Sequence, residues 1–500
     1  MKSGKIWKVG KTKGLKKMMH DRSLSGPTIW CQYLEEPPLR FADGGEHIAP
    51  KLGISHFGPK SYKPPKRHPF LVRVGIIGTA ETIEKAKQWI EKNSEGVQGD
   101  QEHPDFPGYQ EDRGFFSKLL FDEDWIEQLT HSEIEDVLSV RPARVRFEEV
   151  LTLLESKLAL LDRKDRRPEY VVVALPNELY RKCRVVNYRD RHLGDVHRDL
   201  RRAFKAMAMK YRIPTQLLRQ ATTESDGPTT VDGRLKKDYP SEIAWDFFTG
   251  LYFKAGGFPW GPVGLIPGTC YVGIGFYRPL GSNLRAMQTS LVQAFDEHGD
   301  GLVLRGHELT WDPEKERSKS PHLTEEQAYS LVELVLTRYQ EEMKQTPQRV
   351  VVHKTSRYWP AEKEGFKQAL RDRVSRYDLI ALAPQSTVRL LAVNRYPPLR
   401  GTHFCVGDID YLYTTGYIAE LRQFHSVHVP SPLQIADHIG YDTPRETLLR
   451  EILILTKMNW NSSRLGGLWP ITLKFSRMVG DIMREIPADR EPLTNFKFYM

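Results

Sequence analysis

The sequence contains few cysteines and no long apolar run. Its 4 cysteines in 500 residues are scattered, without a C-x-x-C pair or zinc-finger spacing. This distribution predicts reduced, buried thiols and argues against a disulfide framework or a structural metal. No apolar segment approaches the roughly 20 residues of a membrane-spanning helix, and the basic N-terminus lacks the apolar core of a signal peptide. The sequence therefore predicts a cytoplasmic protein with no membrane partner.

Two common kinds of binding motif are also missing. The 16 histidines include no H-x-x-x-H or H-E-x-x-H pair with further ligands nearby, so we expect no histidine-based metal site. Gly273 and Gly275 stand in a G-x-G pattern without the third glycine of a dinucleotide site. What the chain does have is a net charge of +9 and a pI of about 9.1. This balance favours a polyanionic partner such as nucleic acid, although solubility alone can select for it.

The length predicts two or more domains, because 500 residues exceed one ordinary core. Residues 1–26 are rich in lysine and glycine and predict a basic disordered extension. Residues 27–66 are rich in proline and glycine and predict an extended lead-in. The remainder divides at a Pro/Gly-rich hinge into units at 67–262 and 263–500.

Apolar runs typical of strands alternate with amphipathic helices in both units, which predicts an α/β fold. Strands are expected at 70–77, 170–176, 269–277, 301–304 (as a partner of 269–277), 349–353, 377–383, 403–406 and 409–415. Helices are expected at 79–92, 145–161, 199–211, 241–254, 324–341, 445–457 and 471–486. The polar segments 95–114 and 184–198 are expected to be loops.

A basic helix is the first candidate site. Arg201 and Lys205 are four residues apart and share one helical face. Gln216 begins the next element, and Lys254 ends the helix that runs into Gly256. Several cations and an amide donor suit a phosphate pocket, whereas the alternative is a solvated basic face.

Isolated residues elsewhere have structural interpretations. Asp408 and Asp410 are expected to be turn residues of a hairpin. Trp460 and Trp469 are expected in the core rather than as base-stacking platforms, and the asparagines at 459 and 461 as capping residues.

Several segments together resemble the short prokaryotic Argonautes. HRDLRRAFKAMAMKYRIPTQLLR and LYFKAGG resemble their MID domain, and LEEPPLRFADGG, LGISHFGP and VVVALPNELY fit the same branch. TKMNWNSS, GLWPITLKFSRMVGDI and NFKFYM match its C-terminal part. The resemblance covers roughly residues 28–500. It implies a Rossmann-like MID domain at 67–262, followed by an RNase H-like PIWI domain at 263–500.

The resemblance implies roles for individual residues of the basic site. Lys205, Gln216 and Lys254 stand where the family holds the 5′-phosphate of a guide strand. Arg201 stands where the family often has a histidine or tyrosine. The terminal carboxylate, here that of Met500, can approach the phosphate in this family through a bound divalent cation, which predicts Mg²⁺ as a cofactor.

The resemblance also implies that the nuclease centre is degenerate. Cutting members hold two metal ions with several carboxylates, which fix the geometry and neutralise the charge. Gly275 stands where the first aspartate belongs, and Thr355 replaces the second. Lys474 and Arg477 lie where a further ligand is needed, and the one carboxylate of Glu308 cannot organise a metal pair. We therefore predict a protein that is not an enzyme.

The resulting functional prediction is a guide-directed sensor of prokaryotic immunity. A guide RNA would find a complementary single-stranded DNA target without cutting it. The resemblance implies a partner chain with an APAZ region fused to an effector, most often a TIR or sirtuin-like NAD-degrading domain and sometimes a nuclease. Its activation would deplete NAD⁺ and cause abortive infection. The alternatives are a guided endonuclease with an unconventional carboxylate set and a non-specific nucleic-acid scaffold.

Overall fold

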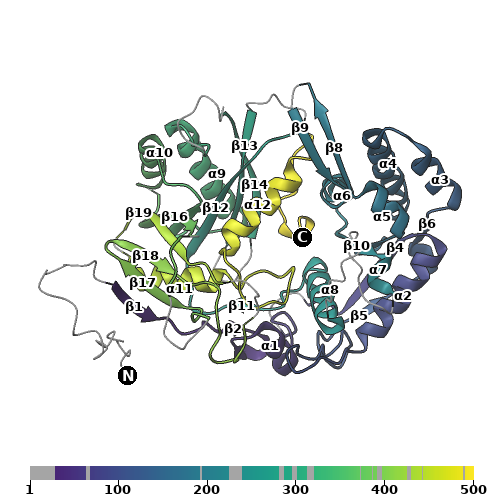
Figure 1. Cartoon of the computed structure of the whole chain (residues 1–500), viewed down its shortest axis with the longest axis horizontal. Coiled ribbons are helices and arrows are strands. Elements are labelled where there is room, and N and C mark those ends of the chain that lie inside the picture. The colour runs from purple at the N-terminus through teal and green to yellow at the C-terminus, as the bar shows by residue number, and fades with distance from the viewer. Residues whose placement is uncertain are drawn as a thin grey trace, which may run out of the picture.

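The computed structural model of the chain describes residues 29–63, 68–191, 194–224, 239–280, 286–295, 301–311, 320–371, 373–385, 387–390, 397–424, 429–441, 443–487 and 490–500. The basic extension predicted at 1–26 lies outside these residues. Figure 1 shows two α/β halves side by side, with the C-terminus between them. Among the described helices, none is both long enough and apolar enough to cross a bilayer.

The first half is built on a parallel sheet with the strand order β10-β7-β4-β5, and β6 also pairs with β4. Its strands are β4 (Leu71–Gly78), β5 (Lys118–Leu120), β6 (Ile126–Gln128), β7 (Tyr170–Leu175) and β10 (Thr215–Arg219). Every residue of β7 is buried, as its continuous apolar sequence predicts for a central parallel strand.

Helices cover both faces of this sheet. They are α2 (Ala80–Ser94), α3 (His131–Ser139), α4 (Ala143–Asp162), α5 (Asn177–Cys183), α6 (Leu200–Ala208), α7 (Gln220–Thr223) and α8 (Pro240–Lys254). Val172 and Ala174 of β7 join one core with residues of α2 and α8, whereas Val171 and Val173 join another with residues of α4 and α6. The alternation follows from the two-residue period of a strand.

The segment predicted as a loop at 184–198 is instead a β-hairpin, and that prediction was wrong. Strands β8 (Val185–Asp190) and β9 (Gly194–Asp199) pair with each other in an antiparallel two-stranded sheet. Of their side chains only those of Val186 and Val196 are buried. With so little of each strand buried, the sequence carries no clear two-residue apolar period.

The second half is built on a nine-stranded sheet with the order β1-β17-β18-β19-β16-β15-β12-β13-β14. The strands are β1 (Ile29–Tyr33), β12 (Thr269–Tyr277), β13 (Ala286–Phe295), β14 (Gly301–Thr310), β15 (Arg349–Lys354), β16 (Arg376–Pro384), β17 (Thr402–Val406), β18 (Ile409–Leu412) and β19 (Leu433–Gly440). The hairpin predicted at 403–415 is confirmed as β17 and β18. The direct pairing of 269–277 with 301–304 was wrong, because β13 lies between β12 and β14.

Four long helices pack on this second sheet: α9 (Glu325–Met343), α10 (Pro360–Arg371), α11 (Arg445–Leu455) and α12 (Ile471–Met483). Helices α9 and α10 share a core with one face, and α11 and α12 share a core with the other. Helix α12 lies so close to β12 that a Cβ on Gly273 would stand 2.2 Å from the main-chain oxygen of Thr472. Glycine is therefore required at that position.

The lead-in predicted to be extended at 27–66 contains several elements in its described part. Strand β1 adds to the second sheet by antiparallel pairing with β17. Strand β2 (Leu39–Arg40) pairs with β3 (Glu46–His47) and with β11 (Gly261–Pro262). Helix α1 (Pro50–Phe57) follows, and the extended prediction was wrong for these residues. Its proline lies at the start of the helix, where the missing N–H is tolerated.

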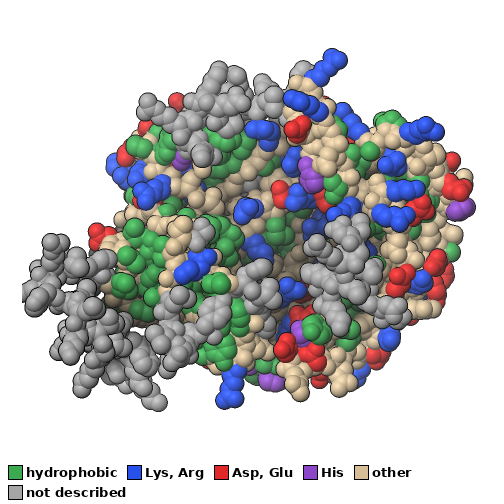
Figure 2. Space-filling model, viewed as in Figure 1, with side chains coloured by type: hydrophobic (Ala, Val, Ile, Leu, Met, Phe, Trp, Pro, Cys, Tyr) green, Lys and Arg blue, Asp and Glu red, His purple; other side chains and the backbone are tan. Residues whose placement is uncertain are grey.

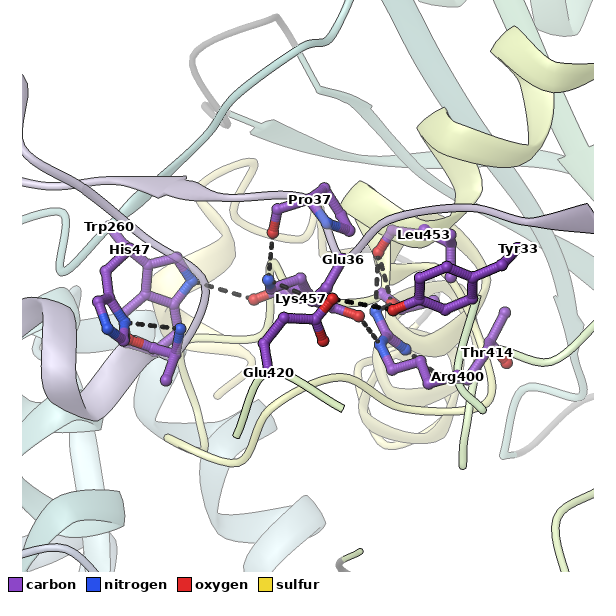
Figure 3. Close-up of polar contacts among 12 residues, drawn as sticks. Tyr33, Glu36, Pro37, His47, Trp260, Arg400, Thr414, Glu420, Leu453 and Lys457 are labelled. Atoms are coloured by element: carbon purple, nitrogen blue, oxygen red, sulfur yellow. Dashed lines mark hydrogen bonds and ion pairs between the residues drawn. The ribbon is translucent and has the colours of Figure 1, made fainter. Parts of the chain in front are cut away.

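A buried ion cluster attaches the lead-in to the second half (Figure 3). Glu36 Oε2 accepts a hydrogen bond from Arg400 Nε at 2.7 Å, and Glu36 Oε1 lies 2.9 Å from Lys457 Nζ. Lys457 also donates to the main-chain oxygen of Pro37, and Trp260 Nε1 donates to the oxygen of Lys457 at 3.0 Å. Each buried charge here has an opposite charge beside it, so loss of one partner would leave an unpaired buried charge and destabilise the fold.

Candidate nucleic-acid interface

Helix α6 carries the first cations of the site. Asp199 caps the helix by accepting a hydrogen bond from Arg202 N at 3.2 Å. Arg201 and Lys205 share one face, as predicted. Lys205 is 2% exposed and donates to the main-chain oxygens of Thr215, at 3.1 Å, and of Met500. Lys205 is therefore a buried cation and not part of the solvated face that the sequence left as an alternative.

Helix α8 and strand β10 complete the group. Lys254 ends α8, is 1% exposed, and donates to the Thr215 oxygen at 3.3 Å and to Gln216 Oε1. The two lysines thus share one acceptor, the Thr215 oxygen. The structure brings together all four predicted phosphate ligands, because Arg201 and Gln216 line a common pocket beside them.

The ammonium groups of Lys205 and Lys254 are buried close to other cations. Burial lowers the pKa of Lys205 well below 10.5, and nearby Lys254 and Arg201 lower it further. Burial and Arg201 likewise lower the pKa of Lys254. Within the described part of the chain, the charged neighbours that shift these two values are all cations. A buried group of like charges favours an anion from outside, since the anion would restore the charged form of each lysine.

The Mg²⁺ predicted beside Met500 needs a donor set that accepts a cation. The described oxygens in contact with the two ammonium groups are those of Thr215, Gln216 and Met500, and each already accepts a hydrogen bond. A dication among these cations is repelled unless an anion accompanies it. The Met500 oxygen, predicted to belong to the terminal carboxylate, is bound to Lys205, so Mg²⁺ here would need an accompanying anion such as the guide phosphate, and it stays a prediction.

A pocket of about 330 Å³ opens beside the lysines. Its walls come from α2, α6, α7, α8, β10 and the segment after α11. Its polar or charged lining residues are Arg201, Gln216, Arg219, Thr222, Glu242, Asp246, Asn461 and Arg464. Trp89 and Phe247 supply an aromatic wall, with ring centroids 5.2 Å apart in an edge-on arrangement. A small cationic end, polar walls and an aromatic surface suit a phosphorylated nucleotide.

The acidic residues of the pocket are held by partners in the protein. Glu242 forms an ion pair with Lys51. Asp246 accepts hydrogen bonds from Ser463 N at 2.8 Å and from Ser463 Oγ at 3.1 Å. Burial raises the pKa of Asp246 above its usual value. These contacts also hold the segment after α11 against α8, so both halves of the molecule form the pocket.

The sequence interpretation missed part of this pocket. Asn461 lies in the TKMNWNSS segment that suggested the family, where it was expected only to cap or bridge the backbone. Arg464 directly follows this segment and had no predicted role. Asn459 Oδ1 accepts from Asn461 N at 3.3 Å, so Asn459 bridges the backbone locally, one of the two roles predicted for it. Trp460 is buried and Trp469 packs against the core, as predicted. No local pattern shows that this segment meets α8, because that contact joins residues about 200 positions apart.

Helix α12 also contributes to this side of the molecule. The pKa of Lys474 is lowered by burial and influenced by Asp246 and Arg464, which places Lys474 near the pocket. The sequence had placed it at the nuclease centre. Arg477, on the same helix, is exposed. Figure 2 shows Lys and Arg side chains around the hollow between the two halves.

The two positions at which the sequence predicts missing nuclease carboxylates lie near the carboxyl ends of neighbouring strands of the second sheet. Strands β12 and β15 are parallel, with Gly273 paired to His353. Continued by two residues, the same register places Gly275 opposite Thr355. Carboxylates at these positions would lie side by side, and glycine and threonine provide none. Glu308 belongs to β14, but its side chain lies outside the described residues.

A buried ion pair lies directly before Thr355. Lys354 and Glu362 form an ion pair, with side chains 1% and 0% exposed. Glu362 also accepts from Leu323 N at 2.9 Å and from Trp359 N at 2.8 Å. Lys354 and the main-chain donors neutralise this carboxylate, and we assign the pair to stabilisation of the fold.

Solved Argonaute structures share this architecture. Clostridium butyricum Argonaute bound to a guide DNA and a 19-mer target DNA aligns with a TM-score of 0.64 at 16% identity, over 94% of this chain and 54% of that one. The Argonaute of A. aeolicus aligns with a TM-score of 0.55 at 16% identity, over 94% and 55%. Drosophila Piwi aligns at 0.54 and 11% identity, over 94% and 56%.

At these identities the likeness concerns the fold. It confirms the predicted α/β class, with a MID-like half followed by a PIWI-like half. The chain spans about half the length of these three structures. No protein-family model and no curated protein matches the sequence.

Proposed function

We propose that this Argonaute-like chain binds the 5′-phosphate of a guide strand and senses a complementary strand without cutting it. The observation that carries the proposal is the meeting of Lys205 and Lys254 in a buried group, with Arg201 and Gln216 on the wall of the adjoining pocket. The Argonaute of Clostridium butyricum, which shares the fold, was solved with a guide DNA and a target DNA.

The chemistry of the pocket supports a terminal phosphate rather than a phosphate within a strand. The lysines are nearly inaccessible to solvent, so only the end of a strand can bring a phosphate to them. Gln216 presents its amide oxygen to Lys254, and its NH₂ group, which donates to the Leu217 oxygen at 3.4 Å, has a second N–H for an incoming oxygen. Arg201 adds a guanidinium, the group best suited to phosphate geometry.

Target sensing without cleavage follows from the nuclease positions. Gly275 and Thr355 supply no carboxylate at adjacent strand ends, and a two-metal mechanism requires several. The guide would be RNA and the target single-stranded DNA, as the resemblance to short prokaryotic Argonautes implies. The effect of target binding must then come from a change in conformation or assembly.

The output is proposed to come from a partner chain with an APAZ region and an effector. The resemblance favours a TIR or sirtuin-like NAD-degrading effector over a nuclease. Target pairing would activate the effector in the cytoplasm, deplete NAD⁺ and arrest the infected cell. The alternative is a guided endonuclease with an unconventional carboxylate set.

The first experiment compares guide RNAs of one sequence with a 5′-phosphate or a 5′-hydroxyl end. We expect the phosphorylated guide to bind at least about tenfold more tightly, because one charge-assisted contact contributes roughly 1.5–3 kcal/mol. Equal affinities would contradict the phosphate pocket.

The second experiment mixes the chain, its partner, guide and labelled single-stranded DNA with Mg²⁺ present. We expect intact target and increased NAD⁺ consumption by the partner. Sequence-specific cleavage that persists when the partner's effector is inactivated would support the endonuclease alternative and overturn the sensor proposal.

A further inference from the structure

A second polar cluster lies in the β17–β18 hairpin, well away from α8 in Figure 1. His403 and Cys405 are two residues apart on β17 and therefore face the same side of the sheet. Asp410 on β18 pairs directly with Cys405. Asp410 is thus a strand residue, and its predicted place in the turn was wrong, whereas Asp408 does lie in the turn.

The three side chains converge on one point. His403 Nε2 lies 2.7 Å from Asp410 Oδ1, and Cys405 Sγ lies 3.0 Å from the same oxygen. The sulfur and the imidazole nitrogen are 3.5 Å apart. Imidazole nitrogen, thiol sulfur and carboxylate oxygen thus form a small triangle whose atoms all lie within 4.8 Å of one another.

We propose that His403, Cys405 and Asp410 bind a Zn²⁺ ion. The donor set of nitrogen, sulfur and oxygen suits Zn²⁺, which accepts all three, better than Mg²⁺ or Ca²⁺, which require oxygen ligands. Three protein ligands leave the fourth tetrahedral position for water. This inference is independent of the proposed guide site.

The geometry is close to one face of a zinc tetrahedron. With ordinary zinc–ligand lengths, the ligand atoms of such a face are about 3.4–3.6 Å apart. The sulfur–nitrogen separation of 3.5 Å already matches, and the two shorter separations are hydrogen-bond distances to Asp410. Metal entry would replace those two hydrogen bonds and spread the atoms by less than about 1 Å.

The surroundings support a bound dication. His403 is buried, and its Nε2 faces the oxygen of Asp410 and the sulfur of Cys405. The other carboxylate oxygen of Asp410 lies 2.9 Å from Arg445 Nε, which orients the carboxylate as an outer-shell partner would. The edge of the Trp30 indole packs on the imidazole, with centroids 5.1 Å apart.

Charge and proton balance are consistent with metal binding. Without a metal, the Cys405 thiol donates its proton in a hydrogen bond to Asp410 Oδ1. Zn²⁺ would displace this proton to solvent and bind the thiolate, and the imidazole proton would move from Nε2 to Nδ1. One dication, one thiolate, one carboxylate and a neutral imidazole sum to zero charge. The ion would fix the hairpin beside β1, where the lead-in enters the sheet.

The test measures zinc in the untagged full chain after expression with added Zn²⁺ and extensive dialysis. We expect about one Zn²⁺ per chain, lost in Cys405→Ser. Cys31→Ser is the matched control, because Cys31 is also partly buried but pairs with Phe404 on the other side of the sheet. A zinc-free wild type, or equal loss in both variants, would overturn the proposal.

A spectroscopic measurement keeps the test decisive if Cys405→Ser does not fold. Co²⁺ substituted into the wild type should give a thiolate charge-transfer band and the visible bands of tetrahedral Co²⁺. Asp410→Asn retains the shape of the side chain and should weaken Co²⁺ binding at least tenfold, while Asp408→Asn, in the adjacent turn, should not. Absence of the charge-transfer band in folded wild type would show that no such site exists.

Discussion

Buried lysines in the two halves of the protein have different partners. In the PIWI-like half, Lys354 lies against Glu362, and Lys457 lies 2.9 Å from Glu36. In the MID-like half, Lys254 donates to the uncharged oxygens of Thr215 and Gln216, and it lies close enough to Lys205 for the two cations to repel each other. Their burial is similar, so the difference is in the counter-charge.

Lysines with a carboxylate partner serve the fold, whereas buried lysines without one are available to an anionic ligand. A buried ion pair balances its charges within the protein. Its main effect on stability appears when one partner is removed, because the other charge is then left buried and unpaired. A buried group of cations without such a partner costs stability, and an anion that enters the site offsets that cost. The comparison therefore predicts opposite consequences when lysines of the two kinds are replaced.

The largest expected effect is on stability. Lys354→Met leaves Glu362 buried without its cation and should lower the free energy of unfolding by about 3–5 kcal/mol. Lys254→Met removes a cation whose acceptors, the oxygens of Thr215 and Gln216, are uncharged, and it should leave stability unchanged or raised. Urea unfolding of both variants measures this. A loss of stability in Lys254→Met as large as that in Lys354→Met would contradict the distinction between the two kinds of lysine.

The next effect is on guide binding. Lys254→Met should weaken binding of a 5′-phosphorylated guide by about tenfold or more, which corresponds to one charge-assisted contact of roughly 1.5–3 kcal/mol. Binding of the 5′-hydroxyl guide should change little. Lys210→Met is the control, because Lys210 lies just beyond α6 but pairs with Glu155 at the surface. If both variants lose the same affinity, the loss comes from the lower positive charge of the protein and not from the phosphate pocket.

A smaller effect concerns protons. The folded pKa values of Lys205 and Lys254 are lowered, so the unfolded chain binds more protons between those values and 10.5. Stability from these groups should therefore increase as pH rises toward 10.5 and should fall as pH drops through the folded values. A bound phosphate favours the charged lysines, so guide binding should take up protons in this window. Calorimetry in buffers of different ionisation enthalpy measures that uptake. If proton uptake persists in a Lys205→Met, Lys254→Met double variant, other groups take up the protons.

The smallest expected effect is at the outer wall of the pocket. Arg464 is exposed, so its attraction for a phosphate is screened by water and salt. Arg464→Ala should weaken guide binding by less than about 1 kcal/mol, an effect that disappears at high salt. A salt-independent loss as large as that of Lys254→Met would place Arg464 with the buried ligands.

Local sequence determined many individual elements. The apolar run at 170–176 predicts β7, and the segment at 269–277 predicts β12, because strand formation depends on short runs that bury both faces. Arg201 and Lys205 could be assigned to one helical face because the period of a helix is local. The weakly patterned hairpin of β8 and β9 could not be found in this way, since its side chains are mostly exposed.

Tertiary structure decided what those residues contact. Lys205 meets the main-chain oxygen of Met500, 295 positions away, and Lys254 meets Gln216, 38 positions away. Burial of the two lysines also arises only when α6, α8 and the last residues pack together, because the cost of desolvation depends on every neighbouring segment. The same holds for the triangle of His403, Cys405 and Asp410. Its sequence spacing matches no common metal motif, and only the pairing of two strands brings its atoms to one point.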